Sequence, residues 1–231
     1  MATALILAAG RGERLRPLTD SVPKPLLSVG GTSLIEWQVA RLVAAGFDDV
    51  VVNHAHLGRQ IEEALGDGKR FAARIRYSPE SPALETAGGI AQALPLLGER
   101  PFVVVSADIY TDFPYQSLHA RAETIARRAV APGAPVAHFV LVENPPWHPR
   151  GDMGLAAGRI TRAKPWLTYG NIAVFHPAVF AEIARGTWLK LFPWMYRLVD
   201  EGRVTGERFD GAWDNVGTAE QLEALDRRLR A

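Results

Sequence analysis

The sequence predicts an α/β fold built around a largely parallel sheet, and two observations support this prediction. Short apolar, β-rich runs alternate with amphipathic stretches through the first half of the chain, which is the pattern of parallel α/β sheets. The chain has 231 residues, of which 48% are hydrophobic and 22% charged, as in globular proteins that bury a substantial core. No internal repeat or linker divides the sequence, so we expect one domain over residues 1–231.

The first predicted strand and helix have clear boundaries. Residues 3–8 (TALILA) form a short apolar run that predicts a buried strand. A helix is expected to begin near Ser33, because Ser33 and Glu36 have the spacing of a capping box, and Gly46 is expected to end it. Five apolar residues form the buried face of this helix: Leu34, Ile35, Val39, Leu42 and Val43.

The rest of the chain continues with further predicted strands and helices. Strands are expected over residues 49–53, around Ile75 and Tyr77, and over residues 101–106, 137–142 and 170–175. Helices are expected over residues 60–65 and 88–97. The last helix is expected from Thr218, because Thr218 and Gln221 repeat the capping-box spacing.

The composition excludes several classes of function. The net charge is +1, from 26 basic and 25 acidic residues, so we expect neither a nucleic-acid partner nor an anionic membrane partner. The absence of cysteine excludes disulfides, thiolate nucleophiles and iron–sulfur clusters. No segment approaches the roughly 20 apolar residues of a membrane span, and no signal peptide is recognised. We therefore expect a cytoplasmic protein.

A glycine-rich turn directly follows the first predicted strand. Gly10 and Gly12 permit positive φ angles and close approach of the backbone, and successive amide N–H groups in such a turn form a concave anion site. The spacing is neither that of a P-loop nor that of a dinucleotide-binding turn. Because four cations fall within this short stretch, the sequence predicts a triphosphate site. The cations are Arg11, Arg14, Arg16 and Lys24, against Glu13 and Asp20.

The segment over residues 5–26, LILAAGRGERLRPLTDSVPKPL, resembles the signature of the sugar-phosphate nucleotidyltransferases, LAAGxGTRLxPLT followed by P-K-P. The resemblance implies a three-layer α/β/α sandwich with a mixed, mainly parallel central sheet of the Rossmann-like nucleotidyltransferase type. It implies that Arg14 and Lys24 are catalytic and contact phosphate groups. Glu13 replaces the threonine of the signature, and its carboxylate must point away from the phosphates or bind elsewhere. The implied nucleotide-binding residues of this segment are Ala8, Ala9, Gly10, Gly12, Glu13 and Arg14.

Two aspartates are expected to hold Mg²⁺, which prefers hard oxygen ligands and usually binds through one or two carboxylates plus phosphate. Asp108 follows the buried run PFVVVSA and therefore lies at the carboxyl end of a strand, where open α/β sheets bind ligands. Asp214 precedes the last helix in WDNVGT. VVSADIYTD resembles the strand-end motif of the family, whose aspartate binds metal. WDNVGT resembles its W-x-D-x-G-T element, and the resemblance implies that Asp108 is also catalytic and that Asp214 is the second ligand.

Further motifs imply the base and sugar sites. LETAGG, residues 84–89, resembles the family loop that wraps the nucleobase and is called the base loop below. Within it Gly88 and Gly89 would let the backbone approach the base, and Glu85 could accept a hydrogen bond from it. For the sugar phosphate, Lys24 is joined by Asp152, Asn171 and Lys164. Lys164 stands in RAKP where the family has V-E-K-P, so the contacts of the missing glutamate stay open.

The implied reaction joins a nucleoside triphosphate to a sugar 1-phosphate and releases pyrophosphate. The resemblance covers almost the whole chain, is greatest to short members without a C-terminal β-helix, and favours UTP with N-acetylmuramate 1-phosphate, a step of peptidoglycan recycling. Glu85 keeps GTP open on chemical grounds, because guanine presents adjacent donors that a carboxylate can accept. The alternatives are GTP with mannose 1-phosphate, CTP with phosphocholine, and an inactive nucleotide-sensing subunit. We expect a monomer or a small homo-oligomer.

Overall fold

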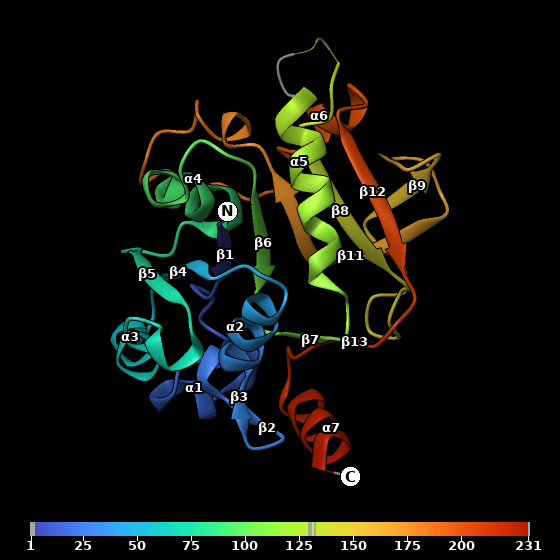
Figure 1. Ribbon diagram of the computed structural model, residues 1–231. Helices are drawn as coiled ribbons and strands as arrows, with labels where there is room; N and C mark the ends of the chain where they lie inside the picture. The colour runs from blue at the N-terminus through green and yellow to red at the C-terminus, as the bar shows by residue number, and fades with distance from the viewer. Residues whose placement is uncertain (1–2, 129–130, 132, 231) are drawn as a thin grey trace.

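The computed structural model describes residues 3–128, 131 and 133–230 (Figure 1). Nine of the described strands form one sheet in the order β5-β4-β1-β6-β11-β8-β12-β10-β9. The strands are β1 Ala4–Leu7, β2 Ser28–Val29, β3 Thr32–Ser33, β4 Asp49–His54, β5 Arg74–Pro79, β6 Phe102–Ser106, β7 Ile109–Thr111, β8 Ala137–Val142, β9 Met153–Ala156, β10 Arg159–Thr161, β11 Trp166–Phe175, β12 Val204–Phe209 and β13 Trp213–Asn215. The helices are α1 Leu18–Ser21, α2 Leu34–Ala44, α3 Gly58–Leu65, α4 Glu85–Leu97, α5 Leu118–Arg128, α6 Tyr196–Asp200 and α7 Ala219–Arg230.

The sheet is mixed, and its two halves differ in strand direction. Strands β5, β4, β1 and β6 are mutually parallel. Strand β11 runs antiparallel to both β6 and β8, and β12 is parallel to β8. At the far edge β10 is antiparallel to β12, while β9 is antiparallel to both β10 and β11. The predicted mixed, mainly parallel α/β fold is therefore confirmed, with β10 and β11 running against the other strands of this sheet.

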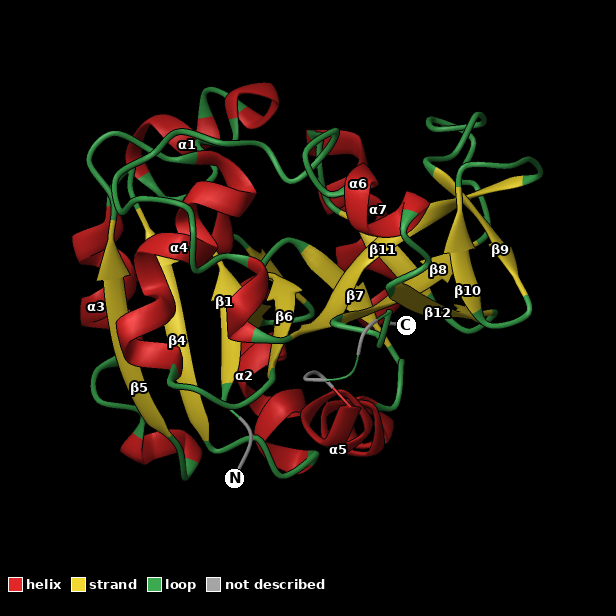
Figure 2. Cartoon of the chain, turned by 90° about the horizontal axis from the view of Figure 1, so that it is seen from above, coloured by secondary structure: helices red, strands yellow, loops and turns green. Residues whose placement is uncertain are grey.

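Helices cover both faces of the sheet, as Figure 2 shows with α5 on one side of the strands and α6 on the other. The pleat of β1 explains the two layers, because successive side chains in a strand point to opposite faces. Ala4 and Ile6 pack in a core cluster with residues of α2, α3 and α5. Leu5 packs in a second cluster with residues of α4 and α6. The predicted three-layer arrangement follows from this alternation.

The predicted elements are all present, and the largest shifts are at the starts of α4 and β11. Helix α2 has the predicted capping box, in which the Ser33 side chain accepts from the Glu36 amide and Glu36 bonds back to Ser33. Helix α4 begins at Glu85 rather than Gly88, and β11 begins at Trp166 rather than Gly170. The sequence analysis gave no bounds for helices α1, α5 and α6 or for strands β2, β3, β7, β9, β10, β12 and β13.

The C-terminal helix α7 returns to the N-terminal segment (Figure 1). Strand β13 pairs antiparallel with β7, and a small core cluster joins Val216 and Leu225 of this region to Leu15 and Leu27. The backbone N–H of Gly30 donates to the Asp226 carboxylate of α7 at 2.8 Å. Segments from the two ends of the chain therefore lie against each other beside the carboxyl ends of β1 and β6.

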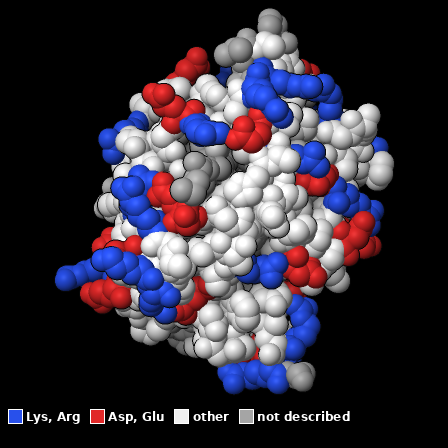
Figure 3. All heavy atoms as spheres, viewed as in Figure 1, with Lys and Arg blue, Asp and Glu red and all other residues white. Residues whose placement is uncertain are grey.

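Among the described residues, no helix is both long enough and apolar enough to cross a membrane. Basic and acidic side chains are interspersed over the face shown in Figure 3. This mixture agrees with the net charge of +1.

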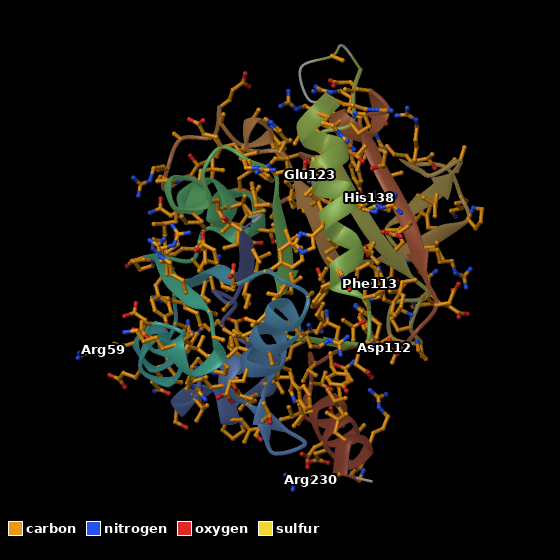
Figure 4. All side chains as sticks on the ribbon, in the orientation of Figure 1. Arg59, Asp112, Phe113, Glu123, His138 and Arg230 are labelled. Carbon is orange, nitrogen blue, oxygen red and sulfur yellow. The ribbon has the colours of Figure 1, made fainter. Side chains whose placement is uncertain are left out.

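A buried histidine and its partners connect α5 to the second half of the sheet. His138 on β8, labelled in Figure 4, has Nε2 at 2.9 Å from Glu207 Oε1 and Nδ1 at 2.9 Å from Thr205 Oγ1. Arg121 of α5 donates to the other oxygen of Glu207 at 3.2 Å. The hydrogen bond from His138, followed by that from Arg121, lowers the pKa of Glu207 from 4.5 to about 2, against the opposing effect of burial.

We expect Glu207→Gln to lower the free energy of unfolding at pH 7 by about 1–2 kcal/mol, after discounting the pair for its partial exposure. Because the pKa of the folded state lies below 4.5, the contribution of Glu207 is fully present above that pH and is lost as the pH falls toward 2. Urea denaturation at pH 7 and pH 3 measures the difference. The control is Glu143→Gln at an exposed carboxylate 4.0 Å from Arg208. Equal effects of the two variants at pH 7 would contradict the prediction.

Candidate functional site

A cavity of about 730 Å³ opens at the carboxyl ends of β1, β4 and β6. Its lining includes all of residues 8–14, which we call the phosphate loop. This loop contains every nucleotide-binding residue predicted for the segment over residues 5–26. Lys24 and Asp108 also line it, as do Glu85 and Thr86 from the start of α4. This is the edge at which open α/β sheets bind ligands. The structure therefore brings the predicted phosphate and catalytic residues around one cavity, together with Glu85 from the predicted base residues.

The two glycines of the phosphate loop have different structural roles. Gly12 has φ +68°, and a Cβ atom there would lie 3.0 Å from side-chain atoms of both Thr19 and Lys24. Its carbonyl accepts from the Leu15 amide and from the Thr19 hydroxyl, each at 2.9 Å. At Gly10, by contrast, a Cβ atom would meet nothing within 4 Å. Gly12 is thus required by the turn, whereas Gly10 leaves open space beside the cavity.

Two arginines of the loop are uncommitted cations. Within the described part of the chain, Arg11 and Arg14 form no ion pair and no side-chain hydrogen bond, and both line the cavity. Arg14 lies close to Gly217, where a Cβ atom would be 3.0 Å from its Nη2. Glu13 is exposed and also lines the cavity. The lining contains three basic residues, Arg11, Arg14 and Lys24, and three acidic residues, Glu13, Glu85 and Asp108.

Lys24 and Asp108 meet at the cavity wall. The Lys24 ammonium is largely buried, with the residue 9% exposed, and donates to Asp108 Oδ2. The backbone around Asp108 is held on two sides, because the amide of Ala107 donates to Leu7 O and the amide of Val216 donates to Asp108 O, each at 2.9 Å. Two of the three predicted catalytic residues, Lys24 and Asp108, therefore form an ion pair. This pair joins the segment after the phosphate loop to the end of β6.

Asp214 lies elsewhere. It is outside the cavity lining, and Arg228 of α7 donates to both of its carboxylate oxygens. This hydrogen bonding raises the pKa of Arg228.

In the W-x-D-x-G-T pattern the aspartate stands two positions after the tryptophan. Counted from Trp213, that position is Asn215, and neighbouring residues of a strand point to opposite faces. Asn215, and not Asp214, therefore occupies the position of the motif aspartate.

The start of α4 forms the other end of the cavity. Glu85 has φ +63°, in the left-handed region that L-residues rarely adopt. Gly88 and Gly89 do not line the cavity. A Cβ atom at Gly88 would lie 2.1 Å from Thr187 O, and one at Gly89 would lie 2.5 Å from Glu80 Oε1. The two glycines therefore permit close packing behind the loop rather than approach of a base.

A buried polar network, which the sequence analysis did not identify, links the two ends of the cavity. Asn53 at the end of β4 accepts from the Ala8 amide at 2.8 Å and donates to Glu80 at 2.6 Å. The other oxygen of Glu80 accepts from the Leu84 amide at 2.8 Å. Burial raises the pKa of Glu80. Its signals in the sequence are the polar Asn53 that ends the apolar run DVVVN and the acidic Glu80 in SPESP.

The predicted sugar-phosphate residues lie on the second half of the sheet, and only Lys24 of that set lines the cavity. Asp152 accepts from the Tyr169 amide at 2.8 Å, and His148 Nε2 lies 3.0 Å from its other oxygen. Asn171 has φ +57°, within the register shift of β11. Lys164 is exposed, with its ammonium 5.4 Å from the centre of the Trp166 ring. The structure therefore does not bring these three residues into the cavity.

Comparisons with known proteins agree with this geometry. Residues 3–138 match the family model described as "Nucleotidyl transferase". The chain is 47% identical over 225 residues to the N-acetylmuramate alpha-1-phosphate uridylyltransferase of Neisseria meningitidis serogroup B, covering 95% of each chain. It is 35% identical to the protein of that name from Caulobacter vibrioides, covering 98% of this chain and 96% of the other.

More distant relatives include mannose-1-phosphate guanyltransferase beta-B of Xenopus laevis, which is 33% identical over 93% of this chain and 61% of its own length. The fold is similar to that of HddC from Yersinia pseudotuberculosis complexed with GMP-PN, with a TM-score of 0.78, 14% identity and 99% of each chain covered. It is also similar to a Bacillus anthracis protein described as a glucose-1-phosphate thymidylyltransferase, with a TM-score of 0.85, 20% identity, and 100% and 96% of the two chains covered. The chain therefore belongs to the nucleotidyl transferase family and, within it, to the sugar-phosphate nucleotidyltransferases.

Proposed function

We propose that this protein transfers the uridylyl group of UTP to N-acetylmuramate 1-phosphate, giving the nucleotide sugar and pyrophosphate. The observation that carries the proposal is the cavity at the carboxyl ends of β1 and β6, whose lining contains the uncommitted cations Arg11 and Arg14 as well as residues of the base loop. The uridylyltransferase of Neisseria meningitidis, at 47% identity over 95% of both chains, supports the donor and the acceptor. We further propose that this reaction is a step of peptidoglycan recycling in the cytoplasm, and that the protein is a monomer or a small homo-oligomer.

The chemistry requires no general base. An oxygen of the sugar phosphate attacks the α-phosphorus of the nucleotide, the bond from that phosphorus to the bridging oxygen breaks, and pyrophosphate leaves with the electron pair. The attacking oxygen is already anionic, so catalysis consists of positioning and charge neutralisation. Arg11 and Arg14 are placed to bind the triphosphate together with the amides of residues 8–12. Lys24 is placed between that segment and Asp108, where it can hold the reacting phosphate.

The donor set at Asp108 fits a magnesium ion. Its carboxylate faces the cavity beside the phosphate loop, and the described residues contain no cluster of three or more histidine, aspartate or glutamate side chains that could hold a metal. Substrate phosphates would therefore complete the coordination, as is usual for Mg²⁺. A bound Mg²⁺ would neutralise charge on the transferring phosphate. Asp214 would have to leave Arg228 to take part.

Mannose-1-phosphate guanylyl transfer is the second candidate, and two observations favour keeping it. Glu85 lines the cavity at the base loop, and a carboxylate can accept from both donors of guanine. The Xenopus laevis guanyltransferase is 33% identical over 93% of this chain.

We expect pyrophosphate release with UTP and N-acetylmuramate 1-phosphate to exceed that of every other substrate pair by at least about tenfold in kcat/KM, which corresponds to roughly 1.4 kcal/mol. The measurement pairs ATP, CTP, GTP and UTP with the 1-phosphates of N-acetylmuramate, glucosamine, glucose and mannose. A preference for GTP with mannose 1-phosphate would replace the proposed substrates by the second candidate.

Arg14→Ala and Lys24→Ala are each expected to lower kcat/KM by at least about tenfold, because a charge-assisted contact to phosphate contributes about 1.5–3 kcal/mol. The control is Arg16→Ala, since Arg16 pairs with Asp20 at 2.7 Å and lies outside the cavity lining. Thermal unfolding and far-ultraviolet circular dichroism test whether each variant is folded. A folded Arg14→Ala or Lys24→Ala enzyme with wild-type kinetics would remove that residue from the site.

Asp108→Asn is expected to lower kcat by about 100-fold or more, because the ligand charge is lost. Asp214→Asn is expected to match Arg228→Ala instead, with kcat/KM within about threefold of the wild type and a stability loss of about 0.5–1 kcal/mol. Rates over a range of Mg²⁺ concentrations and urea denaturation measure the two effects. If Asp214→Asn lost as much activity as Asp108→Asn and recovered it at high Mg²⁺, Asp214 would be a metal ligand after all.

A further inference from the structure

Trp188 is a large apolar side chain exposed at the mouth of the cavity. The residue is 58% exposed and lines the cavity together with Ala83, Glu85 and Thr86. Among the described residues, the other exposed large apolar side chains are Leu18 and Trp147, and neither lines the cavity. An exposed indole is costly in water. Its location in the cavity lining, beside residues of the base loop, makes the ring available to a bound ligand.

Backbone hydrogen bonds hold the segment around Trp188 against the first turn of α4. The Leu189 amide donates to Leu84 O at 3.0 Å, and Leu189 O accepts from the amides of Ala87 and Gly88 at 3.0 and 3.1 Å. These two amides belong to the helix N-terminus, whose N–H groups have no partner within the helix. The orange segment between β11 and α6 accordingly lies beside α4 in Figure 1. Trp188 is thus attached to the base loop rather than to a free surface loop.

Packing on both sides of Trp188 restricts the segment further. Leu189 packs against the core cluster that includes residues of α4, and Leu191 is buried in it. A Cβ atom at Gly88 would lie 2.1 Å from Thr187 O, so the close approach of the segment depends on that glycine. The Lys190 ammonium lies 5.6 Å from the centre of the indole ring, a cation–π contact that favours a fixed ring orientation. The indole is therefore presented to the cavity by a rigid support.

We propose that Trp188 forms a stacking wall for the nucleobase of the donor. The proposal rests on the proposed function. The nucleoside of a triphosphate bound at Arg11 and Arg14 would share one cavity with Trp188 and Glu85. Every base has an apolar π-face, so stacking on an aromatic ring adds affinity without selecting the base. Selection of the base is left to polar groups of the base loop, while Trp188 supplies affinity for the nucleoside.

The test compares UTP with inorganic tripolyphosphate, because only UTP carries a base. Isothermal titration calorimetry in Mg²⁺ buffer is performed on the wild-type protein, Trp188→Ala, Trp188→Phe and Trp147→Phe. Loss of the stacking partner is expected to weaken UTP binding to Trp188→Ala about 10-fold or more and to leave tripolyphosphate binding unchanged. Trp188→Phe keeps a ring and is expected to bind UTP within about threefold of the wild type. Trp147 is 50% exposed but outside the cavity lining, so Trp147→Phe is expected to bind as the wild type does.

Tryptophan fluorescence provides a second measurement. UTP is expected to quench the emission of the wild type and of Trp147→Phe, and to quench Trp188→Phe far less. Wild-type UTP affinity in Trp188→Ala would overturn the proposal, and so would an equal loss of UTP and tripolyphosphate affinity. A wild-type protein that binds UTP but forms no product with any sugar phosphate would overturn the proposed function instead, while leaving the stacking wall supported.

Discussion

The geometry of the cavity depends on the hydrogen bonds of the Asn53 side chain. At the end of β4 it accepts from the Ala8 amide and donates to the buried Glu80 carboxylate, which in turn accepts from the Leu84 amide. One amide group thereby holds the start of the phosphate loop, and through Glu80 it holds the entry to the base loop. A buried network of this kind stabilises one arrangement only when every donor and acceptor is satisfied. Here the described partners satisfy both functional groups of Asn53.

The same network explains why position 89, in the second turn of α4, is a glycine. Glu80 is 6% exposed, and Gly89 lies so close that a Cβ atom would be 2.5 Å from its carboxylate. A larger residue would push the helix away from Glu80, and with it the contacts between Gly88 and residues 187–189. The base loop and the segment that carries Trp188 therefore share one support. Its rigidity comes from hydrogen bonds and close packing, which act together at the helix N-terminus.

Charge is distributed unequally along the cavity. Arg11 and Arg14 face it as uncommitted cations, while Lys24 and Asp108 neutralise each other. A polyphosphate entering the cavity thus meets positive charge that requires little rearrangement, and preorganised charge of this kind stabilises developing anions efficiently. Asp214 also has its charge matched, by Arg228 on α7. The two aspartates that the sequence analysis paired are therefore both ion-paired, but only Asp108 lines the cavity.

Much of the fold could be predicted because its signals are local. The glycine turn after β1, the capping boxes of α2 and α7 and the apolar strands depend on backbone angles and hydrogen bonds between residues close in sequence. The phosphate loop, Lys24, Asp108 and Glu85 are accordingly found at the cavity. The second half of the sheet was predicted less completely, because its order depends on pairings between distant segments.

By itself, the sequence determined the class of fold, the phosphate loop and the family to which the chain belongs. Only the tertiary structure decided which distant groups meet: Arg14 with Gly217, Glu85 with Trp188, and Asp214 with Arg228. It also decided that Gly88 and Gly89 serve packing, and that Asp152, Lys164 and Asn171 lie outside the cavity. The physical reason is register: a shift of one residue in a strand turns a side chain to the opposite face. For Asp214 and Asn215 that direction was decided by the pairing of β13 with β7, not by a local pattern.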